Sequence, residues 1–359
     1  MPHIDIDQIF PNVIGQEATK RRLVESVVAD RLPHAIMLCG PQGAGKLALA
    51  VDFARLLMCQ NLSADGAPCS ECLSCKMARK LEHPDLHFTY PIVRGTRVKE
   101  PKDAVSDTYI REWREMLLQN PYSNLNDWLE RMKADNSQAQ YYVAEADNIQ
   151  RKLSLKSNQG GRKVMVVWLP EKMNQETANK LLKLFEEPPA ATVFILVSED
   201  PDMVLGTIQS RVQRINVPPL SRQQHVDVSR GSSSGMFLDL YIMLMRLAYQ
   251  RKVKDLRDWA DQVSKMGREG QKQFLQFCQQ QLRENFVYNF RLPELSDQTD
   301  AEALFSRNFA KFINEYNVIP MMTELTRAEN DIAQNVNSKM VFFDLAIKTI
   351  TLLITPQTK

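Results

Sequence analysis

The sequence lacks a strong net charge and any apolar run long enough to cross a membrane. Its 45 Lys and Arg residues and 43 Asp and Glu residues leave a net charge of +2. A protein that held DNA by itself would carry a clear basic excess, so any nucleic acid is expected to be bound through partners. The most apolar late stretch, residues 341–354, contains Asp344 and Lys348. It is also shorter than the roughly 20 residues of a membrane helix.

A secretory signal is also missing, because the opening MPHIDIDQIF has no apolar segment. We therefore expect a cytoplasmic protein without membrane association, in a compartment where thiols stay reduced. The six cysteines then indicate metal binding or core packing rather than disulfides. The length of 359 residues predicts two or three domains.

A hydroxyl group is missing from an otherwise complete phosphate-binding motif, GPQGAGKL at residues 40–47. The P-loop pattern G-x-x-x-x-G-K-[ST] ends in a residue whose oxygen holds Mg²⁺, and Leu47 offers none. Residues 33–39 predict a buried strand before the loop, and residues 46–58 predict a helix after it. Strand, glycine loop and helix in this order are the context in which the motif is specific.

The phosphate cradle itself is still present in the sequence. Gly40, Gly43 and Gly45 can offer backbone N–H groups, and Lys46 can meet phosphate oxygens at a helix N-terminus. Weak binding of ATP is one interpretation. A loop that now serves only as a tight turn is the other, and the sequence favours neither.

Four cysteines, Cys59, Cys69, Cys72 and Cys75, follow the spacing C-x9-C-x2-C-x2-C. Four thiolates are a preferred tetrahedral ligand set for structural Zn²⁺. The surrounding loop has no core of its own, and a metal would fold it. A redox role is less favoured because no strand leads into the C-x-x-C pair. We predict a zinc site whose four positions are all filled by protein.

Alternating strand and helix patterns continue to about residue 217. Strands are predicted at residues 85–90, 164–169, 192–197 and 212–217, with helices at 17–30 and 177–187. This alternation predicts an α/β domain with a parallel sheet covered by helices on both faces. A helical insertion at about residues 91–140 places Ile110, Trp113 and Leu117 on one helix face, with a second short helix around Trp128. We interpret it as a surface decoration that packs its own aromatic side chains.

A flexible linker is predicted by the composition of residues 229–235, SRGSSSG. From residue 236 onward the patterns are all helical, without a strand signal. Two apolar stripes are predicted to be core or helix-partner surface. One consists of Phe274, Phe277, Cys278, Leu282 and Phe286, and the other of Met340, Phe343, Ile347, Ile350 and Ile354. The chain thus divides into residues 1–217, a short segment 218–235 and a helical domain 236–359.

Together these motifs resemble bacterial clamp-loader subunits of the AAA+ class, and most of all the delta-prime type of DNA polymerase III. The resemblance is carried by IGQEATKRRL and HAIMLCGPQGAGK, by the cysteine loop followed by HPD at residues 83–85, by NKLLKLFEEPP at residues 179–189 and by TIQSRVQRI, which contains Ser210-Arg211-Val212. It implies that residues 1–217 are an AAA+ ATPase-like domain with a zinc module at 59–75. It also implies that residues 218–235 are a shortened lid and that residues 236–359 are the collar through which subunits oligomerise.

The resemblance also implies a task and partners. Clamp-loader subunits of the gamma/tau and delta types form a pentameric ring that loads the sliding clamp onto primer-template DNA, as part of the DNA polymerase III holoenzyme. In that family the arginine at the position of Arg211 reaches into the ATP site of the adjacent subunit as an arginine finger.

Two departures from a working ATPase point to a subunit without hydrolysis of its own. ATP hydrolysis needs a loop hydroxyl and an acidic residue after a neighbouring strand to hold Mg²⁺. Leu47 removes the first, and the second predicted strand ends in Trp168-Leu169-Pro170-Glu171 without an Asp-Glu pair. We therefore predict a stator that supplies Arg211 in trans.

The alternative is an ATP-hydrolysing gamma-type motor subunit of the same ring, which the same two positions disfavour. A P-loop kinase would need an arginine-bearing lid and an acceptor site, and a general DNA-binding protein would show a basic pattern with aromatic residues. Neither pattern is visible in the sequence.

Overall fold

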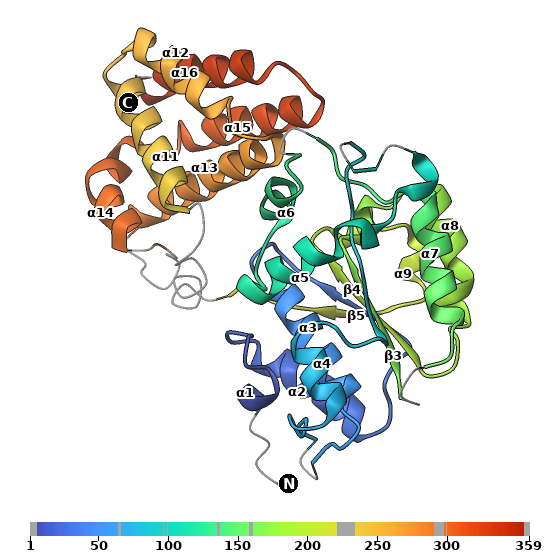
Figure 1. Cartoon of the computed structure of the whole chain (residues 1–359). Helices are drawn as coiled ribbons and strands as arrows, with labels where there is room; N and C mark the ends of the chain where they lie inside the picture. The colour runs from blue at the N-terminus through green and yellow to red at the C-terminus, as the bar shows by residue number, and fades with distance from the viewer. Residues whose placement is uncertain are drawn as a thin grey trace. The chain divides into compact units, whose positions relative to one another are not determined.

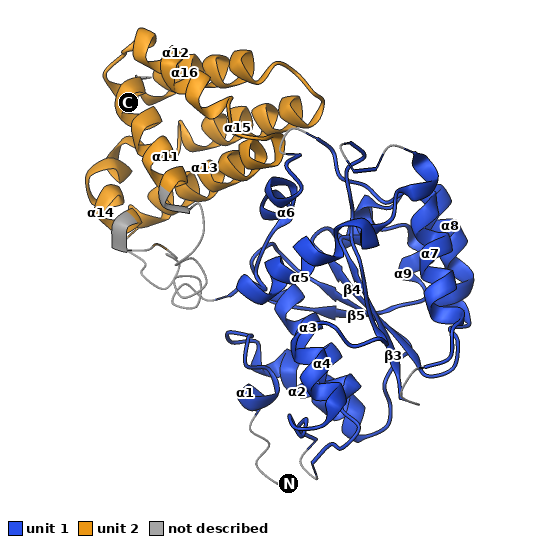
Figure 2. Cartoon of the chain, viewed as in Figure 1, with its two compact units in different colours: residues 1–220 blue, residues 221–359 orange. Residues whose placement is uncertain are grey.

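The computed structural model describes residues 6–63, 66–95, 97–98, 100–134, 137–157, 161–220, 234–290, 298 and 300–354. The chain divides into two compact units, residues 1–220 and residues 221–359 (Figure 2). Most of the predicted short lid, residues 221–233, lies outside the described residues.

The first unit is built on a five-stranded sheet in which all neighbouring strands are parallel (Figure 1). The strand order is β2-β3-β4-β1-β5, and the strands are β1 Ala35–Cys39, β2 Leu86–Thr89, β3 Lys163–Trp168, β4 Thr192–Ser198 and β5 Gln213–Asn216. The predicted parallel α/β sheet is confirmed. Strands β1, β3 and β4 are buried along their whole length, as expected for a sheet covered on both faces.

Helices cover both faces of this sheet (Figure 1). Side chains of alternate strand residues enter two separate cores, because successive residues of a strand point to opposite faces. Ile36 and Leu38 belong to one core, and Met37 and Cys39 belong to the other. The first core is covered by α1 Ile6–Ile9, α2 Glu17–Val28, α3 Lys46–Met58, α4 Leu73–Arg79, α5 Ile110–Gln119 and α6 Leu125–Arg131. The second is covered by α7 Val143–Ser154, α8 Gln175–Glu186 and α9 Gly206–Gln209.

The register of the strands brings their carboxyl ends together at one edge of the sheet. Cys39 of β1 lies opposite Ser198 of β4 on one side and Asn216 of β5 on the other. Trp168 of β3 lies opposite Val197. The chain leaves β1 toward β2 but leaves β4 toward β5, so the connections diverge between β1 and β4. Ligands of open parallel sheets bind at such a switch point, and the P-loop leaves β1 there.

The insertion is part of the main core, so its interpretation as a surface decoration was wrong. Trp113 of α5 and Trp128 of α6 are fully buried, and they pack in the same core as Phe88 of β2 and Trp168 of β3. The rings of Trp113 and Trp168 lie 5.0 Å apart between centroids. The aromatic residues of the insertion therefore complete the domain at the carboxyl edge of the sheet. Three short 3₁₀ turns, Pro101–Asp103, Ser106–Tyr109 and Pro170–Lys172, accompany this region, and a fourth, Pro201–Met203, follows β4.

The second unit is helical throughout its described residues. Its helices are α11 Ser234–Tyr249, α12 Val253–Val263, α13 Arg268–Tyr288, α14 Asp300–Phe309, α15 Val318–Ala333 and α16 Ser338–Ile354, with the 3₁₀ turn Ala310–Phe312. They surround one core that includes Trp259, whose Nε1 donates to the carbonyl oxygen of Leu240 at 3.0 Å. No helix within the described residues is both long and apolar enough to span a membrane.

One predicted stripe of this unit matches its core and the other is displaced. Phe274, Cys278 and Leu282 of α13 are fully buried. In α16 Phe342 and Ala346 are fully buried, whereas Met340 is 71% exposed. Because α16 is apolar on most of its circumference, the sequence period could not decide which face turns inward.

Candidate functional site

The glycine-rich loop joins β1 to α3 at the carboxyl edge of the sheet. Gly43 and Gly45 have φ angles of 78° and 81°, a left-handed conformation that glycine adopts without strain. At Gly40 a Cβ atom would lie 2.2 Å from the carbonyl oxygen of Val217, so the backbone just after β5 leaves no room for a side chain. The structure thus places the three predicted glycines in one turn at the N-terminus of α3, where each has a geometric reason.

Lys46 is turned back into this loop. Its side chain is buried, with 4% of the residue exposed, and its Nζ donates to the carbonyl oxygen of Pro41 at 2.6 Å. Burial lowers the pKa of the Lys46 amine, and the nearby carboxylates of Glu199 and Glu171 oppose that shift. The cation that would meet phosphate is therefore engaged by the backbone of its own loop.

Leu47 occupies the position of the missing hydroxyl as a core residue. It is 5% exposed and packs with the apolar side chains of the first core. The side chain offers no oxygen, and its burial places a hydrocarbon where a P-loop ATPase holds Mg²⁺.

The loop is covered by Tyr122, which lies in the turn between α5 and α6. A Cβ atom built on Gly45 would meet the Tyr122 ring at 3.0 Å, so the ring lies directly against this glycine. The Tyr122 hydroxyl accepts a hydrogen bond of 2.8 Å from the backbone N–H of Ile14. The cavity left at the loop has a volume of about 20 Å³. It is lined by loop residues, by residues 121–123, and by Trp168, Val197 and Glu199 at the ends of β3 and β4. That volume holds about one water molecule.

Trp168 lies at the strand end where a working P-loop ATPase has an acidic residue that holds Mg²⁺. It is 2% exposed, and its ring packs against Trp113, which in turn stacks on Tyr90 with centroids 4.0 Å apart. Trp128 meets both Trp113 and Tyr90 edge-on. This aromatic cluster fixes α5 and α6, and with them the turn that carries Tyr122.

Glu171, the one acid just after β3, is committed to the backbone. Its Oε1 accepts from the N–H groups of Glu199 at 2.9 Å and Asp200 at 3.3 Å. Burial raises the pKa of the Glu171 carboxyl, and these N–H donors partly offset the shift. These hydrogen bonds therefore connect the end of β3 to the turn after β4 at the edge of the sheet.

Arg211 follows α9 on another part of the surface. Its side chain is 33% exposed and forms an ion pair with Glu186, the last residue of α8. Its Nη1 donates to the carbonyl oxygen of Thr207 at 2.8 Å. Arg211 does not line the cavity at its own P-loop, so the structure keeps these two predicted features apart.

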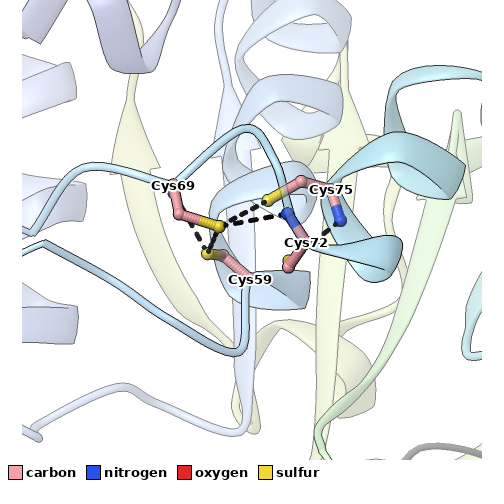
Figure 3. A group of neighbouring side chains, drawn as sticks. All are labelled: Cys59, Cys69, Cys72 and Cys75. Carbon is pink, nitrogen blue, oxygen red and sulfur yellow. Dashed lines mark hydrogen bonds between the residues drawn. The ribbon is translucent and has the colours of Figure 1, made fainter.

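The four predicted cysteines converge on one point, as Figure 3 shows. Their Sγ atoms all lie within 4.8 Å of one another. Cys59 and Cys69 are 3.6 Å apart, and Cys69 and Cys75 are 3.9 Å apart, between sulfur atoms. These separations bracket the edge of about 3.8 Å expected for a tetrahedron with Zn–S bonds of about 2.3 Å. The cluster could therefore hold a metal ion, and its geometry fits zinc.

Local structure orients the thiols. Cys59 follows α3, Cys72 is the N-cap of α4, and Cys75 lies in the first turn of that helix. Backbone N–H groups point at the sulfur atoms, with Cys69 N donating to Cys59 Sγ at 3.3 Å and Cys72 N donating to Cys69 Sγ at 3.4 Å. Burial raises the pKa of the Cys59 and Cys75 thiols, whereas backbone donors from Cys72 and Glu71 lower the pKa of the Cys69 thiol to about 6. Such donors favour the thiolate form that binds metal.

His83, which follows the cysteine loop, is bonded to protein through both ring nitrogens. Its Nδ1 accepts from the backbone N–H of Asp85 at 3.1 Å, and its Nε2 lies 3.2 Å from Ser74 Oγ. Because Ser74 belongs to α4, this buried histidine links the cysteine module to the start of β2. It serves as a brace beside the cluster.

Comparison with known proteins finds relatives among DNA polymerase III subunits. The subunit delta' of Pseudomonas aeruginosa is 33% identical over 178 residues, 50% of this chain and 41% of the relative. The subunit delta' of Bacillus subtilis is 27% identical over 205 residues, 57% of this chain and 48% of the relative. A family model described as DNA polymerase III, delta subunit, matches residues 15–221, more than half of the chain. The chain belongs to the DNA polymerase III delta-prime family.

Other matches lie outside the delta-prime type. The subunit tau/gamma of Haemophilus influenzae is 26% identical over 261 residues, 72% of this chain and 31% of the relative. A solved gamma subunit-related protein of Thermotoga maritima has 14% identity and a TM-score of 0.36, covering 94% of this chain and 100% of that one. The assignment to the delta-prime family rests on the sequence matches, and it confirms the predicted resemblance. In each of these curated relatives the match spans less than half of the relative's length.

Two residues at these sites were not predicted from the sequence. Tyr122 lies in the turn NPYSN, which carries no motif, and only the aromatic packing of the insertion brings it to Gly45. Glu186 was visible within NKLLKLFEEPP, but its proximity to Arg211 depends on the packing of α8 against α9.

Replacing one cluster thiol tests the metal centre. Cys72→Ser should lower the bound zinc and the melting temperature, because a structural zinc loop loses a ligand and its fold together. Metal content by atomic spectroscopy and thermal unfolding would measure both. Cys278→Ala, in the core of the other unit, serves as the control and should keep its zinc. Unchanged zinc in Cys72→Ser would refute the assignment.

Removing the aromatic cover tests whether Tyr122 closes the cradle. Tyr122→Ala should bind inorganic pyrophosphate at least about tenfold more tightly than the wild type, a gain of about 1.4 kcal/mol, because the loop N–H groups and Lys46 become accessible. Isothermal titration calorimetry would measure it. Tyr122→Phe keeps the ring over Gly45 and should show no gain, and adding Lys46→Ala to Tyr122→Ala should abolish it. A folded Tyr122→Ala variant without any gain would contradict this role.

Proposed function

We propose that this chain is a non-hydrolysing stator of a bacterial clamp loader, which helps load the sliding clamp onto primer-template DNA during replication. Membership of the delta-prime family supports the assembly, and the covered P-loop supports the absence of hydrolysis. In this proposal its partners are gamma/tau- and delta-type subunits in a pentameric ring. The assembly, and not this chain alone, would bind the clamp and the DNA, as the low net charge of +2 suggests.

The observation that carries the proposal is the cavity of about 20 Å³ left at the P-loop. ATP hydrolysis needs a bound Mg²⁺ with protein ligands and an oriented water. Here Tyr122 covers the loop, Leu47 contributes hydrocarbon, and Glu171 accepts hydrogen bonds from the backbone. In this proposal the cover opposes nucleotide binding, and neither Leu47 nor the hydrogen-bonded Glu171 supplies a ligand for Mg²⁺.

Arg211 would give such a subunit a part in the chemistry of its neighbour. Arginine fingers supplied in trans stabilise the charge that develops on the transferred phosphoryl group and raise the rate by about 10³ to 10⁵. The guanidinium of Arg211 is partly exposed and lies away from the chain's own loop. A closed cradle and an accessible arginine together suit a rigid member of a motor ring.

The domain roles follow from the same proposal. Residues 1–217 would be the AAA+ ATPase-like domain, residues 218–235 a shortened lid, and residues 236–359 the collar that joins the ring. The cysteine cluster would hold a structural zinc that folds the loop at residues 59–75 without taking part in catalysis.

A gamma-type motor subunit is the second candidate, because a tau/gamma relative matches 72% of this chain. A motor subunit would need an open cradle with metal ligands. ATP turnover by the isolated chain would decide between the two.

Steady-state ATP hydrolysis tests the stator. The chain alone should show no turnover. Mixed with motor subunits, clamp and primed DNA, the wild type should support ring activity, and Arg211→Ala should slow the site that it completes by about 10³-fold or more. Robust ATP turnover by the isolated chain would refute the stator proposal and favour a motor subunit.

Substitution of the loop lysine gives a complementary test. Lys46→Ala should change ring ATP turnover by less than about twofold, because Lys46 bonds Pro41 beneath a closed cover rather than a nucleotide. A melting curve would show that the variant is folded, since the side chain is buried. A large loss of ring ATP turnover in a folded variant would refute the stator proposal.

A further inference from the structure

The guanidinium of Arg211 is held from two sides by its own chain. Its Nε donates to Glu186 Oε1 at 2.6 Å, and its Nη2 contacts the same oxygen. On the other side, Nη1 donates to the carbonyl oxygen of Thr207 at 2.8 Å and to Ser210 Oγ at 3.0 Å. The plane of the side chain is therefore fixed by α8 and by the end of α9.

Most of the N–H donors of the Arg211 guanidinium are already used within the chain. A guanidinium has five N–H donors in a rigid planar fork, and the four contacts to Glu186, Thr207 and Ser210 occupy four of them. The remaining N–H belongs to Nη2, next to the Glu186 contact. A side chain that would otherwise sample many rotamers is thus restricted to one orientation, with one donor that has no partner among the residues that the structure describes.

Glu186 lies at the end of a helix that is packed firmly against the sheet. It is the last residue of α8, directly after Phe185, which is fully buried against Phe194 of β4 with ring centroids 4.9 Å apart. The helix cannot continue far beyond it, because Pro188 and Pro189 follow. The backbone that carries Glu186 is therefore fixed relative to the sheet, while its side chain is 44% exposed.

The ion pair is poorly placed to serve stability. Exposed pairs typically contribute about 0–1 kcal/mol, and both side chains here are partly in solvent. What the pair does fix is the direction of the guanidinium. Groups that act on a transition state gain from being held in position in advance.

We propose that Glu186 is the positioning residue of Arg211, holding the guanidinium in the orientation in which it meets the phosphates bound by the neighbouring subunit. This inference rests on the proposed function, since it gives Arg211 its role in trans. Glu186 acts through Arg211 and does not touch the nucleotide.

The test uses the assembled ring with clamp and primed DNA. Glu186→Ala should lower kcat for ATP about tenfold, because a displaced catalytic group loses rate steeply with position. The KM for ATP should stay within about twofold, because the neighbour's own residues bind the ground state. The control is Glu187→Ala: Glu187 is the adjacent carboxylate, exposed and without a side-chain partner among the described residues. It should match the wild type.

A double variant separates positioning from a general structural effect. In the Arg211→Ala background, Glu186→Ala should cause no further loss, because residues that act as a unit are not additive. An equal loss in both backgrounds would mean that Glu186 acts through the fold, and the inference would fail. A rise in turnover with Glu186→Ala would mean that the carboxylate withholds the arginine, which would also overturn it.

Failure of the proposed function gives a different pattern. If Arg211→Ala leaves ring turnover unchanged, the stator with an arginine in trans is wrong, and the role of Glu186 falls with it. If Arg211→Ala slows the ring but Glu186→Ala does not, only the positioning role is refuted.

Discussion

The contact between Trp168 and Trp113 is the interaction on which the functional surface depends. Trp168 ends β3, which lies between β2 and β4, and Trp113 belongs to the insertion. Aromatic pairs contribute about 0.5–1.5 kcal/mol each beyond the apolar area that they bury, and this pair continues into Trp128 and Tyr90. The cluster fastens α5 and α6 over the carboxyl edge of the sheet. Tyr122, in the turn between them, is thereby placed against Gly45.

One substitution at the end of β3 therefore has two consequences. A tryptophan instead of an acid leaves no metal ligand at this strand end, and the same ring anchors the cover of the P-loop. The lack of an acid at this position and the cover over the loop are physically linked, because a large apolar ring at an open edge must be buried. The phosphate cradle then keeps the shape of a P-loop while its interior is filled by the chain itself.

Away from this edge, the polar groups are arranged to hold backbone and side chains in place. Glu171 receives N–H groups of the turn after β4, His83 braces the cysteine module against β2, and Glu186 holds Arg211. The cysteine sulfurs likewise receive backbone N–H groups. Hydrogen bonds and ion pairs therefore hold the chain in place at each of these points.

The sequence by itself determined the parallel α/β sheet, the strand–loop–helix context of residues 40–47, the grouping of four cysteines and the helical second half, because spacing and period are local properties of the chain. It also showed the missing oxygen at Leu47 and the missing acid at Trp168. Only the tertiary structure decided that the insertion belongs to the core, that Tyr122 covers Gly45, that Glu186 meets Arg211 and which face of α16 is buried. These contacts join residues far apart along the chain, and no local pattern records which distant surfaces will pack together.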